Sequence, residues 1–357
     1  MGIVFCHASS IYYYCNPRIL TNFNISFFIT FFTSGRFISI PLFVMISGAL
    51  LINKQYSFKN FFTKRLNRIF VPFAFWIIIY LLFSKFILHK HLTSKYIMEI
   101  IFGEGGKLGV IFWFIWMILI VYIGIFLINK ILEHGKEKYK EFDKKFLTIL
   151  TILSLIIYVL INLGLISSYP SQIGYYILFI PYAVFGYYLS NLKSNNLKFL
   201  KKYKINAKTI IISTLLVSII GYVFYVNYVV LESMKFNTYT SGSYFQLIVM
   251  IFSFAIFLFF KNISYSNGKY LKKFYTFLYS KSVKKITCSI SYCSFGIYFI
   301  HFLLLKFITK VIIKGFHYEN EPLFWTPILL ITVFMGSWIL TLILSKIPFI
   351  NRFSGVT

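Results

Sequence analysis

Nine apolar runs follow one another along this chain, and each is long enough to cross a bilayer. Crossing about 30 Å of hydrocarbon takes roughly 20 helical residues, and a helix satisfies its own backbone hydrogen bonds there. The runs lie at 25–53, 69–88, 109–129, 146–166, 172–190, 209–230, 244–260, 289–313 and 324–345. The first dozen residues look like the end of one more run. The sequence therefore predicts an all-α, polytopic integral membrane helix bundle of about ten spans, the first truncated at its N-terminus.

The composition excludes a water-soluble protein. Apolar residues make up 59% of the 357 residues and charged residues only 13%, which leaves too little polar surface to cover a soluble domain. The longest polar stretches, near 130–145 and 261–288, are the size of loops. We therefore expect one transmembrane domain over residues 1–357. In 261–285, lysines alternate with aromatic residues, which is typical of an amphipathic helix on a membrane surface.

The distribution of basic residues predicts the orientation in the membrane. The loops at 54–68, 130–145, 193–208, 261–285 and 346–352 hold 26 of the 36 Lys and Arg residues. These loops alternate with poorly basic ones along the whole chain, and cytoplasmic loops are the ones enriched in Lys and Arg. We therefore expect a multi-pass membrane protein with a cytoplasmic C-terminus.

The net charge of +27 comes largely from these basic loops. Positive loops and their attraction to anionic lipid account for most of it. We expect no nucleic-acid partner, because no basic patch exists apart from short membrane loops. The four cysteines lack metal-ligand spacing, and we expect no metal.

All nine acidic residues fall in loops. Transporters coupled to protons or sodium usually carry a carboxylate within the membrane to bind the ion. The sequence therefore disfavours coupled transport.

Ionisable residues at membrane depth are the first candidates for chemistry. His7 and Arg36 lie toward the outer side on the predicted topology. A histidine can take a proton from a hydroxyl at neutral pH, although an imidazole bonded to a backbone carbonyl would serve structure alone. Arg36 is costly in lipid unless it is buried in protein or lines a polar cavity, although its side chain can also extend to the outer headgroups.

Two further places carry candidates. Arg65 and Arg68 are three residues apart at the cytoplasmic end of a span, so they share a helical face suited to a phosphate. The alternative is that they only anchor this end of the helix. His301 lies about halfway along its run, where a neutral imidazole needs a hydrogen-bond partner.

Several segments together resemble the acyltransferase 3 family of bacterial membrane acyltransferases. Residues 39–48 (SIPLFVMISG) are similar to the family's SVPLFFMISG, and the basic turn at 64–72 ends in the similar RIFVP. Weaker similarities occur at 112–115, which includes Trp113, at 182–188 and at 296–301. The order of these motifs matches over essentially the whole chain. The branch that it resembles most contains the O-acetyltransferase of enterobacterial common antigen.

This resemblance implies an enzyme that uses cytosolic acyl-CoA, acetyl-CoA above all, to acylate a hydroxyl of a cell-surface polysaccharide or its lipid-linked precursor. It implies that His7 is the catalytic group and that Arg65 and Arg68 hold the acyl-CoA. Arg36 is our candidate for stabilising the oxyanion, on position alone. His301 and Trp113 are further candidates. The resemblance also implies a location in a bacterial cytoplasmic (plasma) membrane and partners in a polysaccharide assembly system.

Two other functions remain open at this point. The same architecture suits a glycan exporter or flippase, and an inactive accessory protein of a glycan assembly system is a third possibility. The family's motif includes an Arg ten residues before its His, and that position would fall before Met1. We therefore expect either a start upstream of Met1 or a truncated first span.

Overall fold

The chain is described by a computed structural model. It covers residues 1–15, 17–103, 108–139, 141–167, 171–192, 207–238, 243–263, 269–312, 321–348 and 350–355. Within these ranges the chain forms helices and turns, with no strand. The basic loop at 193–206 lies outside them.

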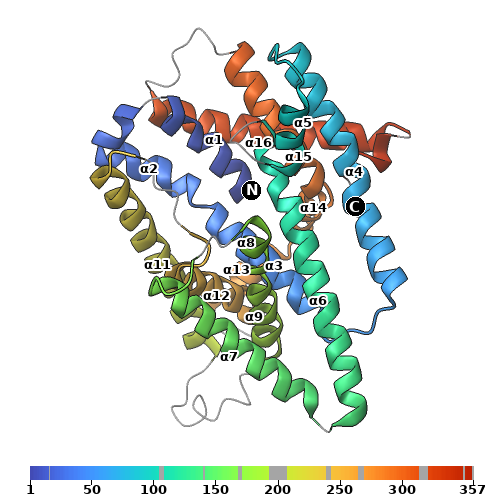
Figure 1. Cartoon of the computed structure of the whole chain (residues 1–357). Helices are drawn as coiled ribbons and strands as arrows, with labels where there is room; N and C mark the ends of the chain where they lie inside the picture. The colour runs from blue at the N-terminus through green and yellow to red at the C-terminus, as the bar shows by residue number, and fades with distance from the viewer. Residues whose placement is uncertain are drawn as a thin grey trace.

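The long helices pack side by side into one bundle (Figure 1). The α-helices are α1 (Gly2–Cys15), α2 (Phe23–Thr33), α3 (Arg36–Leu51), α4 (Phe58–Phe86), α5 (Ser94–Phe102), α6 (Trp113–Lys138), α7 (Phe142–Asn162), α8 (Gln172–Ile177), α9 (Ile180–Asn191), α11 (Ala207–Lys235), α12 (Leu247–Asn262), α13 (Lys269–Leu278), α14 (Lys281–Tyr292), α15 (Ser294–Phe307) and α16 (Pro322–Lys346). Short helical turns at Pro17–Thr21, Leu108–Phe112, Ile308–Ile312 and Ile350–Arg352 complete the described elements.

The predicted fold class is confirmed. In the described residues, eight helical segments are long and apolar enough to cross a membrane. The apolar α12 has 16 residues and α1 has 14, so both are shorter than these segments. The total of ten spans stays a prediction.

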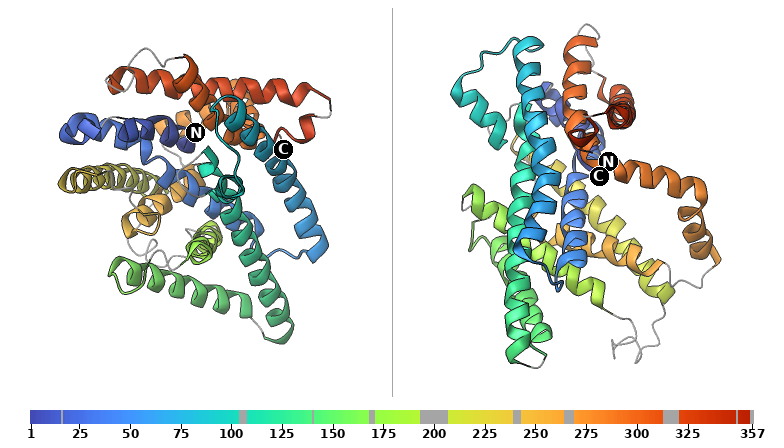
Figure 2. Two further views of the ribbon diagram at one scale, coloured as in Figure 1. Left: turned by 45° about the horizontal axis from the view of Figure 1, so that its top comes forward. Right: turned by 90° about the vertical axis from the view of Figure 1, so that its right-hand side faces the viewer.

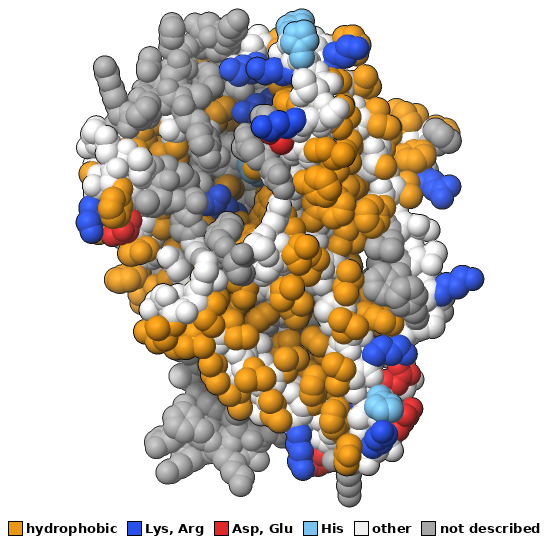
Figure 3. Space-filling model, viewed as in Figure 1, with side chains coloured by type: hydrophobic (Ala, Val, Ile, Leu, Met, Phe, Trp, Pro, Cys, Tyr) orange, Lys and Arg blue, Asp and Glu red, His pale blue; other side chains and the backbone are white. Residues whose placement is uncertain are grey.

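The outer surface of the bundle is apolar, as a lipid environment requires. Leu50, Ile220 and Ile331 are each more than 60% exposed although they lie on long apolar helices. Hydrophobic side chains cover the middle of the face seen in Figure 3, and most of the charged side chains lie in its upper and lower parts and at its sides. Extensive apolar exposure of this kind marks a surface that lipid covers.

The run at 25–53 corresponds to one candidate membrane span, Phe23–Leu51, whose helix is interrupted by a turn. Helix α2 ends at Thr33, Ser34 and Gly35 form a turn, and Arg36 opens α3. Gly and Ser in succession are a common cause of kinks, because Gly has low helix propensity. The break places a helix N-terminus and an arginine inside an otherwise apolar segment.

Pro41 within α3 is accommodated by a neighbouring helix. Proline has no N–H, so the carbonyl of Phe37, four residues earlier, loses its helical donor. The hydroxyl of Ser253 on α12 donates to this carbonyl oxygen at 3.5 Å. Such a replacement is how a membrane protein tolerates proline in a span.

Helices α13 and α14 project from the side of the bundle, in orange in the right-hand view of Figure 2. Leu271 and Tyr275 of α13 pack on Phe259 and Ile263 at the end of α12, whereas α14 buries no residue. The region predicted as one amphipathic helix is therefore two helices.

Candidate functional site

Helix α1 carries His7 and is held on one side by α2. The Ser9 hydroxyl lies 2.9 Å from that of Thr33, and the Tyr13 hydroxyl donates to the carbonyl of Ser26 at 3.0 Å. Residues 9 and 13 are four apart and share a helical face. His7 comes two residues before Ser9, which is about 200° around the helix, so it points away from α2.

The first turn of α1 lies directly on the break between α2 and α3. A Cβ atom added to Gly2 would come within 2.6 Å of the carbonyl oxygen of Gly35 and 2.0 Å of the Ser39 hydroxyl. Only a glycine allows this approach. The contact fixes the position of α1 against the start of α3.

On its other side α1 faces α15, which brings two histidines together. The ring centroids of His7 and His301 are 5.4 Å apart, and the ring planes are inclined by 37°. The ring of Phe302 packs edge-on against His7 with a centroid distance of 5.1 Å. His301 is fully buried and His7 is half-buried.

The two nitrogens of His301 have different surroundings. Nδ1 lies 3.1 Å from the carbonyl oxygen of Ile297, one turn earlier in α15. Nε2 is buried and has no hydrogen-bond partner among the described residues. A buried ring nitrogen without a partner is costly, which makes it a candidate functional group.

Arg36 approaches the same place from α3. Its Nη1 atom is 3.9 Å from the sulfur of Cys6, the residue before His7, and its guanidinium lies over the ring of Phe37 at 4.7 Å. Arg36 is also the first residue of α3, so the positive end of that helix dipole adds to its charge. The guanidinium of Arg36 and the positive end of the α3 dipole together can stabilise a negative charge near His7.

The described helices that make the main contacts with α1, namely α2, α3, α15 and α16, carry no carboxylate. They lie within residues 1–98, 233–318 and 322–357, which contain no Asp or Glu. Besides Arg36, a cation comes from Lys306, whose Nζ lies 5.3 Å from the centroid of the Phe302 ring. The cluster therefore combines positive charges and imidazoles, and these four described helices bring no anion to pair with a histidine.

The predicted donor residues are on α4. Arg68 is exposed, while the side chain of Arg65 lies outside the described residues. Farther along α4, Trp76 stacks on Phe299 of α15 with centroids 5.9 Å apart, and the Tyr80 hydroxyl donates to the carbonyl of Phe299 at 2.8 Å. Eight residues of helical rise, about 12 Å, separate Arg68 from Trp76.

Comparison with known proteins decides the family. The model of a family described as an acyltransferase domain, the acyltransferase 3 family, matches residues 1–342. The chain belongs to the acyltransferase 3 family. No curated protein and no solved structure matches it.

Membership in the acyltransferase 3 family makes this chain a membrane acyltransferase. The match starts at residue 1 and reaches into α16, so His7, Arg36, Arg68 and His301 all lie within the family's domain. Their roles stay predictions, since the match concerns the domain as a whole.

Trp113 lies apart from the histidines in an aromatic cluster of the acyltransferase. Its ring centroid is 5.9 Å from that of Tyr244, which in turn is 4.7 Å from that of Phe37, under the Arg36 guanidinium. Trp113 is thus two rings removed from Arg36.

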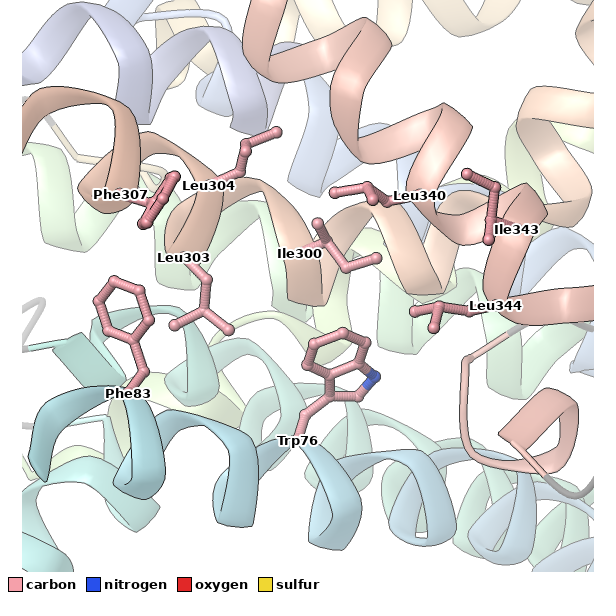
Figure 4. Close-up of a pocket in the computed structure, with 9 residues that line it drawn as sticks. All are labelled: Trp76, Phe83, Ile300, Leu303, Leu304, Phe307, Leu340, Ile343 and Leu344. Atoms are coloured by element: carbon pink, nitrogen blue, oxygen red, sulfur yellow. The ribbon is translucent and has the colours of Figure 1, made fainter. Parts of the chain in front are cut away.

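An apolar groove lies alongside the site between α4, α15 and α16 (Figure 4). Its lining includes Trp76, Ile300 and Leu344, and its only side-chain polar atom is the indole nitrogen of Trp76. The described lining residues of this groove include no acid–base group.

Sequence reasoning missed one member of this cluster, Phe302, whereas Lys306 is recognisable in the sequence as an ionisable residue at membrane depth. Lys306 had a signal in the sequence, since a lysine five residues after His301 in an apolar run is costly in lipid. Phe302 had none, because one phenylalanine among many apolar residues is not distinctive. The contact between His7 and His301 also had no local signal.

Proposed function

We propose that this membrane acyltransferase transfers an acyl group, most simply acetyl, from cytosolic acyl-CoA to a hydroxyl of a cell-surface polysaccharide or its lipid-linked precursor. The observation that carries the proposal is that Arg36, at the start of α3, contacts Cys6 of α1, the residue before His7, beside the break between α2 and α3. The motif similarities at 39–48 and 64–72 favour the branch that contains the O-acetyltransferase of enterobacterial common antigen.

The proposed reaction balances with the residues at this site. His7 takes the proton of the acceptor hydroxyl as its oxygen attacks the thioester carbonyl carbon. Arg36 stabilises the resulting tetrahedral oxyanion. When the carbon–sulfur bond breaks, the imidazolium of His7 returns the proton to the departing CoA thiolate. The products are an ester and free CoA.

Arg65 and Arg68 would hold the phosphates of the donor at the cytoplasmic end of α4. Arg68 and Trp76 are about 12 Å apart along the helix, and Trp76 is level with Phe299, two residues before His301. The long pantetheine arm of CoA suits such a separation. This arrangement requires loops with Lys and Arg in the cytoplasm and acceptor access from the other side.

Substitution of His7 tests the proposed function. Membranes carrying the protein are incubated with radiolabelled acetyl-CoA, and label in alkali-labile esters of surface glycan is counted. We expect His7→Ala to lower transfer at least about 100-fold, because general bases contribute that much. His134→Ala is the matched control, because His134 is exposed at the end of α6 and lies outside the site.

Mass spectrometry of surface glycan with and without the gene completes the test. Loss of acetyl ester without loss of glycan supports acyl transfer. Unchanged ester content in the deletion strain would overturn the proposal, and glycan trapped inside the cell would favour an exporter.

A further inference from the structure

The tautomer of His301 follows from its hydrogen bond. The carbonyl oxygen of Ile297 can only accept, so Nδ1 of His301, 3.1 Å away, carries the hydrogen. In a neutral imidazole the other nitrogen then has a free lone pair. Nε2 of His301 is therefore an acceptor, and no described residue donates a hydrogen bond to it in the structure.

His7 is the neighbour that can supply this donor. The two ring centroids are 5.4 Å apart. A hydrogen bond of about 3 Å between ring nitrogens, lengthened by the radius of each ring, gives a centroid separation close to this value. His7 is half-buried and can rotate about its side-chain torsions, and hydrogen bonds of catalytic groups often tighten only when substrate is bound.

A histidine base normally needs a partner that fixes its tautomer. The usual partner is a carboxylate that accepts from one ring nitrogen and leaves the other free to take a proton. The described helices α2, α3, α15 and α16, which pack on α1, offer none, because they contain no Asp or Glu. The charges of Arg36 and Lys306 nearby are positive.

We propose that His301 is the positioning residue of His7: its Nε2 accepts a hydrogen bond from one ring nitrogen of His7 and so leaves the other as the base. A neutral imidazole thereby replaces the carboxylate of an ordinary triad. The arrangement suits a site within a membrane, where an isolated carboxylate is costly. The proposal rests on the proposed function of His7 as base.

Two substitutions at one position separate hydrogen bonding from packing. In His301→Gln the side-chain amide can donate to Ile297 and accept from His7, whereas His301→Phe offers only a ring. We expect His301→Phe to lower kcat for acetyl transfer about 10- to 100-fold, as for the loss of one buried hydrogen bond, with the KM for acetyl-CoA unchanged. His301→Gln should recover most of this loss.

Phe295→Leu is the matched control. Phe295 lies on the same helix as His301, and its ring contacts those of Tyr298 and Phe299 rather than either histidine. We expect Phe295→Leu to keep kcat within about threefold of wild type. Equal activities of His301→Gln and His301→Phe would overturn the proposal, as would a His301→Phe enzyme with unchanged kcat.

A spectroscopic measurement keeps this proposal separate from the proposed function. Nitrogen NMR of protein labelled with ¹⁵N-histidine distinguishes the two neutral tautomers, and His7→Gln assigns the His7 signals. We expect one tautomer of His7 in wild type and in His301→Gln, and a mixture in His301→Phe. An unchanged tautomer in His301→Phe would overturn the pairing. Failure of acetyl transfer with a tautomer that depends on His301 would contradict the proposed function alone.

Discussion

Arg36 lies at a helix N-terminus inside the membrane-spanning segment because the helix is interrupted between α2 and α3. In a continuous span its guanidinium would face either lipid or packed side chains. At the start of α3, it lies beside Cys6 and over Phe37, with the positive helix end behind it. Arg68, in contrast, is exposed on α4. The two arginines therefore serve different steps in the proposed reaction.

The same substitution at both arginines should affect different kinetic constants. Arg36→Gln removes stabilisation that acts only in the transition state, so we expect kcat to fall about 100-fold with a similar KM for acetyl-CoA. Arg68→Gln removes a phosphate contact, so we expect KM to rise about 5- to 20-fold with kcat nearly unchanged. Initial rates over a range of acetyl-CoA concentrations measure both constants.

Arg36→Gln and Arg68→Gln serve as controls for each other. A rise in KM alone for Arg36→Gln would contradict the proposal that Arg36 lies at the reacting carbonyl. A fall in kcat alone for Arg68→Gln would contradict a role in donor binding.

Helices α3 and α9 approach so closely that their backbones touch. A Cβ atom on Gly48 of α3 would lie 1.9 Å from the carbonyl oxygen of Ala183, and one on Gly186 of α9 would lie 1.9 Å from that of Met45. Small residues at such crossings are a common packing device in membranes. The contact fixes α3, and with it the position of Arg36.

Adding one methyl group at this crossing should destabilise the bundle. We expect Gly48→Ala to lower the free energy of unfolding by about 1–3 kcal/mol, because backbone atoms cannot move aside as a side chain can. Thermal unfolding in detergent, followed by size-exclusion chromatography, measures the loss. Gly336→Ala is the matched control, since its added methyl would meet only the flexible end of Leu304 at 2.8 Å. Equal stability of the two variants would contradict a rigid crossing.

At the level of elements, the apolar runs predicted most helices well. The runs at 69–88 and 324–345 differ by only one or two residues at each end from the candidate spans Asn67–Phe86, within α4, and Pro322–Lys346, which is α16. The run at 25–53 was predicted without its break, because Ser34 and Gly35 are not polar enough to interrupt hydropathy. The end of a helix depends on its backbone hydrogen bonds and on contacts with neighbouring helices. The mean hydropathy of a run of residues contains neither.

For the whole molecule, the proposed reaction requires a definite orientation. The donor is cytosolic and the acceptor is on the other side, so the Lys-rich turn between α6 and α7 should face the cytoplasm. The segment between α4 and α5 should then face outward. His134 lies near the turn between α6 and α7, and His91 lies in the segment between α4 and α5. Both side chains are exposed.

Labelling of introduced cysteines tests this orientation. In a variant with the four native cysteines replaced by serine, we expect a membrane-impermeant maleimide to label His91→Cys in right-side-out vesicles. His134→Cys should react only in inside-out vesicles. The opposite pattern would invert the topology and place Arg68 on the acceptor side.

The sequence by itself determined the membrane environment, the helical fold class, the expected orientation and the candidates His7, Arg36, Arg68 and His301. These depend on the hydrophobicity and charge of each segment and on local motifs, which are properties of neighbouring residues. Only the tertiary structure brought His7 to His301 and Arg36 to Cys6. Such contacts depend on which helix faces pack together. The complementary shapes of the helices determine this packing, for example where Gly2 contacts Gly35 and where the Ser9 hydroxyl contacts that of Thr33.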